Sequence, residues 1–97
     1  MKAVFILYNQ SLTEEVQEIL EKLSIRGYSQ WLDVKGRGSV NGSPHEGTHT
    51  WPELNNAHLT IVDDEKVPAL LERLQSLNKE VKEQGLRAFV WNIEGTI

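Results

Sequence analysis

Short apolar runs recur four times along the chain, and each has the length of a β-strand. Residues 3–8 (AVFILY) form a continuous apolar run, and its shortness favours a central strand that is buried on both faces. Residues 57–62 alternate apolar and polar positions, and residues 28–35 and 86–93 are rich in aromatic and branched side chains. The pattern therefore predicts four strands.

The segment between the first two strands carries apolar residues at helical spacing. Ser11 and Glu14 form a capping-box pattern at its start, and Gly27 is the predicted stop. The apolar stripe of this first helix consists of Val16, Ile19, Leu20 and Leu23.

A second helix is predicted between the third and fourth strands. Asp63 or Asp64 can cap its start, and Pro68 is tolerated in its first turn. Gly85 is the predicted end. The stripe of this helix consists of Val67, Leu70, Leu71, Leu74, Leu77 and Val81.

The order of these elements divides the chain into two similar β-α-β units. Units of this size predict an α+β fold, the ferredoxin-like split β-α-β sandwich (βαββαβ), in which two helices cover one face of a four-stranded antiparallel sheet. Another two-layer α+β sandwich with a different strand order is the alternative. We expect residues 1–97 to form a single domain of this kind.

Two helices can cover only one face of such a sheet. The other face then carries large aromatic side chains, which we expect to be Trp31, Trp91 and either Phe5 or Phe89. Aromatic residues on an otherwise exposed face predict a subunit interface. The alternative places both tryptophans under the helices as part of the core.

A long polar stretch separates the second and third predicted strands. Residues 36–56 (GRGSVNGSPHEGTHTWPELNN) exceed the connections that compact domains use, and loops of this length are commonly functional or disordered. Trp51 is too apolar to be fully solvated, so we expect it to pack at the base of the loop or to serve as an aromatic platform for a ligand or partner. The sequence therefore places function in this loop.

Composition narrows the classes of function. The net charge is −4 and no basic run is present, so the sequence predicts no nucleic-acid partner. The chain contains no cysteine, which excludes disulfides and thiolate metal sites. The N-terminal apolar run is too short for a signal peptide and no stretch is long enough to cross a membrane, so we expect a cytoplasmic protein without membrane insertion. No nucleophile–base pair is recognisable, which predicts a non-enzyme.

Two segments resemble the P-II signalling superfamily. Val34-Lys35-Gly36-Arg37-Gly38 is similar to that family's V-K-G-aromatic-G at the end of the second strand, and residues 62–67 (VDDEKV) are similar to its V-P-D-E-K-V at the start of the second helix. The resemblance implies a ferredoxin-like homotrimer with ligand sites between subunits and long projecting loops. The ligand-binding residues that it suggests are Lys35, Gly36, Arg37 and Gly38. Trp51 is a further candidate ligand-binding residue, as an aromatic platform in the loop.

The chain departs from that family in three segments. Residues 36–56 contain no tyrosine, whereas the family's loop carries one that is modified. Residues 79–86 (KEVKEQGL) hold one glycine where the family has a glycine-rich phosphate-gripping segment, and the C-terminal basic pair is missing. A triphosphate needs backbone donors and positive charge. The chain therefore resembles a shortened member with a changed ligand, and its remaining candidate cations are Lys35, Arg37, Lys82 and Arg87.

A metal-binding motif also lies in the loop, because His45 to His49 match H-E-x-x-H. Zinc hydrolases of this kind need both histidines on one helix, with the glutamate as general base. Pro44, Gly47 and Thr48 do not favour a helix, so this reaction is the less favoured reading.

Metal binding without catalysis is a separate hypothesis. His45, Glu46 and His49 are side chains that bind zinc, nickel or copper, and a trimer would bring three such loops together. Glu53 and His58 are candidates for additional ligands. The alternative is a solvated loop with incidental histidines.

Three functions follow, and the sequence favours the first. This is a P-II-like regulatory protein that binds a small ligand, such as a nucleotide, between subunits and acts through residues 36–56 on a partner, for example a membrane transporter. The second is a metal-binding or metal-tolerance protein like the related CutA trimers, with a divalent transition metal on the loop histidines. The third is an H-E-x-x-H metallohydrolase.

Overall fold

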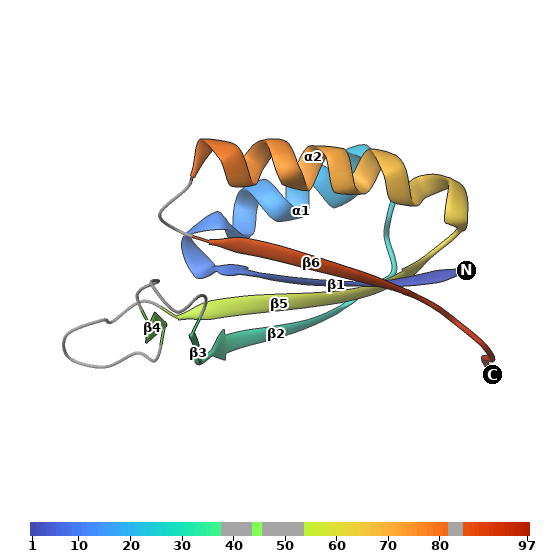
Figure 1. The fold of residues 1–97 in the computed structure, drawn as a ribbon, viewed down its shortest axis with the longest axis horizontal. Helices are drawn as coiled ribbons and strands as arrows, with labels where there is room; N and C mark the ends of the chain where they lie inside the picture. The colour runs from blue at the N-terminus through green and yellow to red at the C-terminus, as the bar shows by residue number, and fades with distance from the viewer. Residues whose placement is uncertain (38–43, 46–53, 82–84) are drawn as a thin grey trace.

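The computed structural model of the protein describes residues 1–37, 44–45, 54–81 and 85–97 (Figure 1). The strands are β1 (Lys2–Asn9), β2 (Ser29–Val34), β3 (Gly36–Arg37), β4 (Pro44–His45), β5 (Asn55–Val62) and β6 (Leu86–Asn92). The helices are α1 (Thr13–Lys22) and α2 (Val67–Glu80), preceded by the 3₁₀ turns η1 (Gln10–Leu12) and η2 (Asp64–Lys66). The four strands that the apolar runs predict are β1, β2, β5 and β6.

Four strands form one antiparallel sheet in the order β2-β5-β1-β6. The apolar run of β1 occupies a central position, as its composition predicts, and pairs along its length with β5 and β6. Figure 1 shows both helices on the same side of this sheet. The ferredoxin-like α+β prediction is therefore confirmed.

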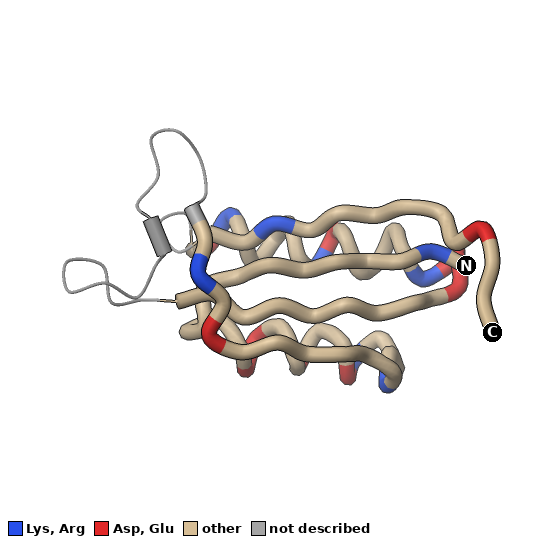
Figure 2. Tube along the Cα trace, turned by 90° about the horizontal axis from the view of Figure 1, so that it is seen from below, with Lys and Arg blue, Asp and Glu red and all other residues tan. Residues whose placement is uncertain are grey.

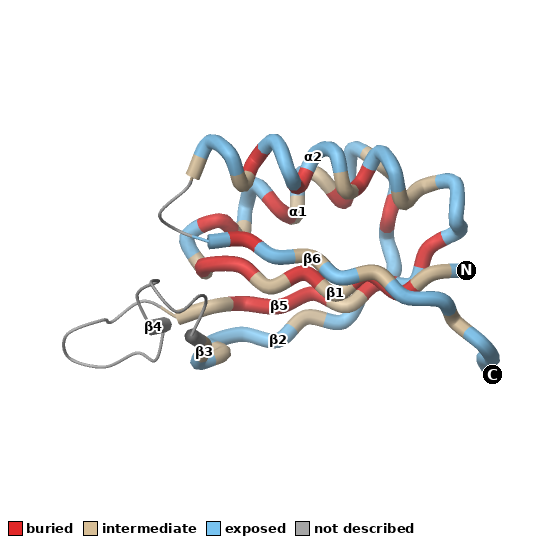
Figure 3. The backbone as a smooth tube through the Cα atoms, in the orientation of Figure 1, coloured by how far each residue is buried: buried red, intermediate tan, exposed pale blue. Residues whose placement is uncertain are grey.

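The core lies between the helices and the sheet. Alternation along β1 directs Val4, Ile6 and Tyr8 toward the helices, and all three are buried. Figure 3 shows the same pattern, with buried positions along β1 and β5 and on the inner sides of the helices. The helices supply Val16 and Leu20 from α1 and Leu70, Leu74 and Leu77 from α2. Burial of each such side chain stabilises the fold by about 1.5–3 kcal/mol.

The ends of the first helix differ from the predicted ones. Asn9, not Ser11, caps the preceding turn, because its side chain accepts a hydrogen bond from the Ser11 N–H at 2.9 Å. The helix stops at Lys22, well before Gly27, and Ser24 takes the left-handed conformation (φ 57°) that glycine commonly takes at this place. Gly27 does not have a positive φ.

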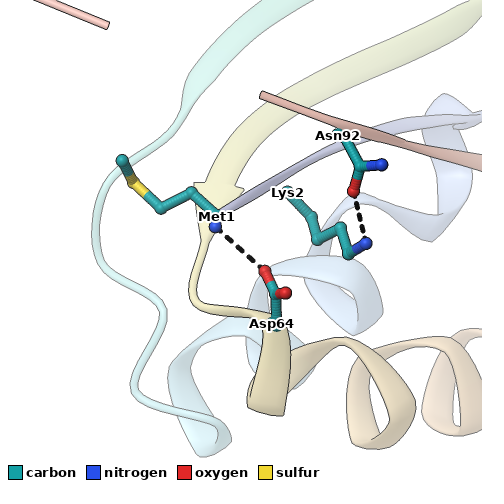
Figure 4. A network of polar contacts seen from close by, with 4 residues as sticks. All are labelled: Met1, Lys2, Asp64 and Asn92. Atoms are coloured by element: carbon teal, nitrogen blue, oxygen red, sulfur yellow. Dashed lines mark hydrogen bonds and ion pairs between the residues drawn. The ribbon is translucent and has the colours of Figure 1, made fainter. Parts of the chain in front are cut away.

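A polar network lies at the start of η2 (Figure 4). The Met1 amino group is 2.9 Å from an Asp64 carboxylate oxygen, and its hydrogen bond lowers the pKa of Asp64. Lys2 Nζ donates to Asn92 Oδ1 beside it. The predicted cap is wrong in detail, because Asp63 makes no side-chain capping bond and Asp64 binds the amino group. Pro68 does lie in the first turn of α2, and no described helix is long and apolar enough to span a membrane.

Candidate functional site

The residues that flank the long loop and residues 82–84 lie at one end of the sheet. The N–H of Asn9, at the end of β1, donates to Gly85 O at 3.2 Å, and the N–H of Gln10 donates to Leu54 O at 2.9 Å. Val34, at the end of β2, lies opposite Asn55 at the same level. The turn that follows β1 is therefore bonded to both borders.

The predicted ligand segment begins at this end. Lys35 is exposed and directly follows β2. The backbone then continues into β3, where Gly36 lies opposite His45 and Arg37 opposite Pro44. A side chain at position 36 would place its Cβ 3.0 Å from Asn55 Nδ2, so the close approach to Asn55 favours glycine.

The structure places only some of the predicted ligand residues. Lys35, Gly36 and the backbone of Arg37 are described, whereas Gly38 and Trp51 lie outside the described residues. The predicted loop bounds are too wide, since β3 begins at Gly36 and β5 already begins at Asn55.

Most residues of the metal hypothesis lie outside the described part of the chain. His45 lies in the two-residue strand β4, so the H-E-x-x-H match begins in extended backbone and not in the helix that a zinc hydrolase needs. Glu46, His49 and Glu53 lie outside the described residues. Within the described part of the chain, no group of three or more metal-binding side chains comes together.

The assignment of His58 to the loop site is wrong. It lies within β5 on the side that the helices cover, and it is fully buried. Its Nδ1 is 2.8 Å from the Tyr8 hydroxyl, and Tyr28 packs edge-on against its ring. A buried ring in these contacts is part of the core.

The uncovered face of the sheet, hereafter the aromatic face, is mostly apolar, and one exception is Arg87, whose guanidinium lies 6.0 Å from the centre of the Phe89 ring. Trp31, Phe89 and Trp91 are each almost half exposed, and the Phe5 and Trp31 rings lie 6.3 Å apart. The alternative that both tryptophans lie under the helices is therefore wrong. Figure 2 views this face, with charged positions confined to the strand ends. The register adds Ala3 and Leu7 of β1 and Ala57, Leu59 and Ile61 of β5.

The polar and apolar sides of β5 are reversed from the usual arrangement, in which the apolar side of a strand faces the core and the polar side faces water. Its helix-facing side carries Asn56, His58 and Thr60, which are all buried, whereas its other side is wholly apolar after Asn55. In a monomer the apolar set would be expected to face the core. Exposed apolar surface of this extent is typical of protein interaction sites.

Sequence reasoning missed two residues that shape the loop base. Asp33 has a left-handed φ of 59°, and its N–H donates to the Asn56 side chain at 3.0 Å. Asn56 falls within the predicted loop, residues 36–56, but it is a buried residue of β5. The tolerance of aspartate and asparagine for left-handed backbone was the available signal, but it is weak.

A groove of about 550 Å³ between the two helices is another concave feature of the described residues, and it involves charged side chains. Glu15, Glu18, Glu72 and Arg73 line part of it. It lies on the helix layer and contains none of the predicted ligand residues.

Comparisons with known proteins agree with this geometry. A family model described as nitrogen regulatory protein P-II matches residues 1–97. CPII, a nitrogen regulatory PII-like protein from Thiomonas intermedia K12 whose structure is bound to ADP, AMP and bicarbonate, is 22% identical over 95% of this chain and 84% of that chain, with a TM-score of 0.79. A second CPII structure, bound to ADP and bicarbonate, is 23% identical with the same coverage and a TM-score of 0.77.

A protein from Thermus thermophilus, described as a candidate PII-like signalling protein, is also similar. It is 25% identical over 95% of this chain and 85% of that chain, with a TM-score of 0.66. No curated protein matches the chain.

Proposed function

Because the chain belongs to the nitrogen regulatory protein P-II family, we propose that it is a regulatory protein that binds an adenine nucleotide between subunits and acts through residues 36–56 on a protein partner. The match of the family model over residues 1–97 is the observation that carries this proposal. The regulatory class follows from the family, while the ligand, its site and the partner are parts of the proposal.

Charge at the site favours a nucleotide with fewer phosphates than ATP. The segment before β6 has one glycine, so few backbone donors are available there for a triphosphate. Lys35 directly follows β2 and is exposed, and Gly36 comes next, where a Cβ would lie 3.0 Å from Asn55 Nδ2. ADP or AMP, together with a small anion such as bicarbonate, suits this smaller set of groups, and the related CPII was solved with these ligands.

The proposed assembly is a homotrimer. P-II proteins are trimers, and the aromatic face is a surface that a second copy of the same composition can cover. The inverted polarity of β5 supports burial of this face in the assembled protein. A partner protein would then meet the loops that follow β3, and we propose a membrane transporter as that partner.

Calorimetric titration tests the ligand part of the proposal. We expect the full chain to bind ADP or AMP more tightly than ATP, with bicarbonate changing the affinity. Lys35→Gln should weaken ADP binding about tenfold, as loss of one hydrogen bond to a charged group does. Lys22→Gln is the matched control, because Lys22 ends α1 and makes an exposed pair with Glu18 that contributes little. Equal ADP affinity in both variants would contradict the assignment of Lys35.

The metal alternative is open to the same titration with zinc, nickel or copper in place of the nucleotide. It rests on His45, Glu46 and His49, and only the backbone of His45 is described. Stoichiometric metal uptake that His49→Ala abolishes, without nucleotide binding, would favour the metal-binding function over the one proposed.

A further inference from the structure

The register between β2 and β5 contains a β-bulge immediately before the proposed ligand segment. Trp31 lies opposite Ala57 and Val34 lies opposite Asn55, so Leu32 and Asp33 together face Asn56. Asp33 adopts the left-handed conformation, with φ at 59°. A bulge of this kind adds one residue to a strand and re-aims the side chains that follow it.

The bulge determines the face of the sheet to which alternation assigns the Lys35 side chain. Side chains alternate along a strand, so a shift of one residue moves every later side chain to the opposite face. With the bulge, Val34 shares the face of Trp31. Lys35 is the next residue, and continued alternation assigns its side chain to the other side. Without the extra residue, alternation would assign Lys35 to the aromatic face, where a charged side chain would have to be desolvated in an assembly.

The side chain of Asn56 holds the bulge. Its Oδ1 accepts from the Asp33 N–H at 3.0 Å, and its Nδ2 donates to Thr13 Oγ1 at 2.9 Å. The Thr13 hydroxyl donates its own proton to Gln10 O at 2.6 Å, so its oxygen is an acceptor toward Asn56. This chain of donors fixes the orientation of the Asn56 amide, whose side chain is buried.

The three bonds also tie the bulge to a rigid part of the fold. Thr13 is the first residue of α1, and the N–H of Gln10 donates to the carbonyl of Leu54, the residue before β5. The conformation of Asp33 is therefore held from the helix layer and not from the loop itself.

We propose that Asn56 is a positioning residue for ligand binding, because its amide holds the left-handed conformation of Asp33 and thereby presents Lys35 away from the aromatic face. The inference rests on the proposed function, in which Lys35 and Gly36 contact the nucleotide. The competing account is that Asn56 only satisfies buried hydrogen bonds and contributes stability.

Substitutions at Asp33 separate the two accounts, because this exposed residue can be changed without altering the core. Asp33→Val places a β-branched side chain where φ is positive, which is strained, so the bulge should be lost although Asn56 is intact. Asp33→Gly is the matched control, since glycine adopts this conformation freely. Asn56→Ala removes the amide that holds the left-handed conformation at position 33. Adding Asp33→Gly to this variant should restore that conformation.

The experiment combines amide NMR spectra with ADP titration of the full chain. We expect Asp33→Val and Asn56→Ala to shift the Val34, Lys35 and Gly36 signals and to weaken ADP binding about tenfold. Asp33→Gly should leave the ADP affinity and the Lys35 and Gly36 signals unchanged, and it should recover most of the affinity in the double variant. Thr60→Val is the stability control, because it removes a buried hydrogen bond to Gly27 O near the other end of β5.

Two results would overturn the inference. The first is an Asp33→Val variant in which the Lys35 and Gly36 signals and the ADP affinity stay at wild-type values. The other is an Asn56→Ala, Asp33→Gly variant that folds but does not recover affinity. Failure of the proposed function is distinct, because wild-type protein would then not bind ADP while the NMR shifts of the variants still report whether Asn56 holds the bulge.

Discussion

His58 lies on β5 with its ring enclosed by Tyr8 and Tyr28. Burial raises the pKa of Tyr8, and its hydroxyl shares a hydrogen bond of 2.8 Å with His58 Nδ1. The other ring nitrogen, Nε2, has no hydrogen-bond partner in the part of the chain that the structure describes. Burial also lowers the pKa of His58, because the charged imidazolium loses its hydration.

This lowered pKa predicts a pH dependence of stability. The unfolded chain protonates His58 near its ordinary pKa of about 6.5, whereas the folded protein does so only at lower pH. Below about pH 6.5 the unfolded state binds more protons, so the free energy of unfolding decreases as the pH falls toward the folded-state pKa. At neutral pH and above, the contribution is fully present.

The variant His58→Leu measures this effect by urea denaturation at several pH values. We expect a lower free energy of unfolding, by about 1–3 kcal/mol, because the buried Tyr8 hydroxyl loses its partner. The decrease in stability between about pH 7 and pH 5 should be smaller than in wild type. Parallel pH profiles for the two proteins would show that His58 does not titrate in this range on unfolding.

The sequence could not place His58, and the reason is physical. The segment AHLTIV alternates clearly, but alternation does not say which of its two sides the helices cover. Ala57, Leu59 and Ile61 are the more apolar set, yet they face away from the helices. Similarly, the sequence does not reveal the bulge at Asp33. The residues that hold it are Asn56, on another strand, and Thr13, at the start of a helix.

At the scale of elements, apolar periodicity predicted the helices and strands, whereas their ends depended on local bonds. The stripe of α2 holds Leu70, Leu74 and Leu77 against the sheet, and this spacing is visible in the sequence. The end of α1 is set by Ser24 in a left-handed conformation, which a search for glycine places three residues too late. Contacts between distant segments, such as Gln10 with Leu54, leave no periodic signal.

The helix stripe gives a quantitative prediction. Leu74→Ala should lower the free energy of unfolding by about 2–5 kcal/mol, because it removes a fully buried side chain and leaves a cavity beneath α2. Gln75→Ala, one position along on the exposed side of the same helix, should change it by about 0.5 kcal/mol or less. Urea denaturation measures both, and similar losses in the two variants would contradict the packing described for α2.

At the scale of the whole molecule, the aromatic face links fold and function. One sheet face is packed by the helices, and the other exposes Trp31, Phe89 and Trp91. The sequence predicted this division because two helices can cover only one face. The proposed homotrimer buries this face, and the proposed nucleotide site lies between its subunits.

Native mass spectrometry of the full chain, alone and with ADP and bicarbonate, tests this account most directly. We predict a complex of three chains that takes up one nucleotide per chain. Trp91→Glu should dissociate the complex and abolish uptake, whereas Ala69→Glu, on the exposed side of α2, should leave both unchanged. A wild-type monomer, or a trimer that takes up no nucleotide, would contradict the account.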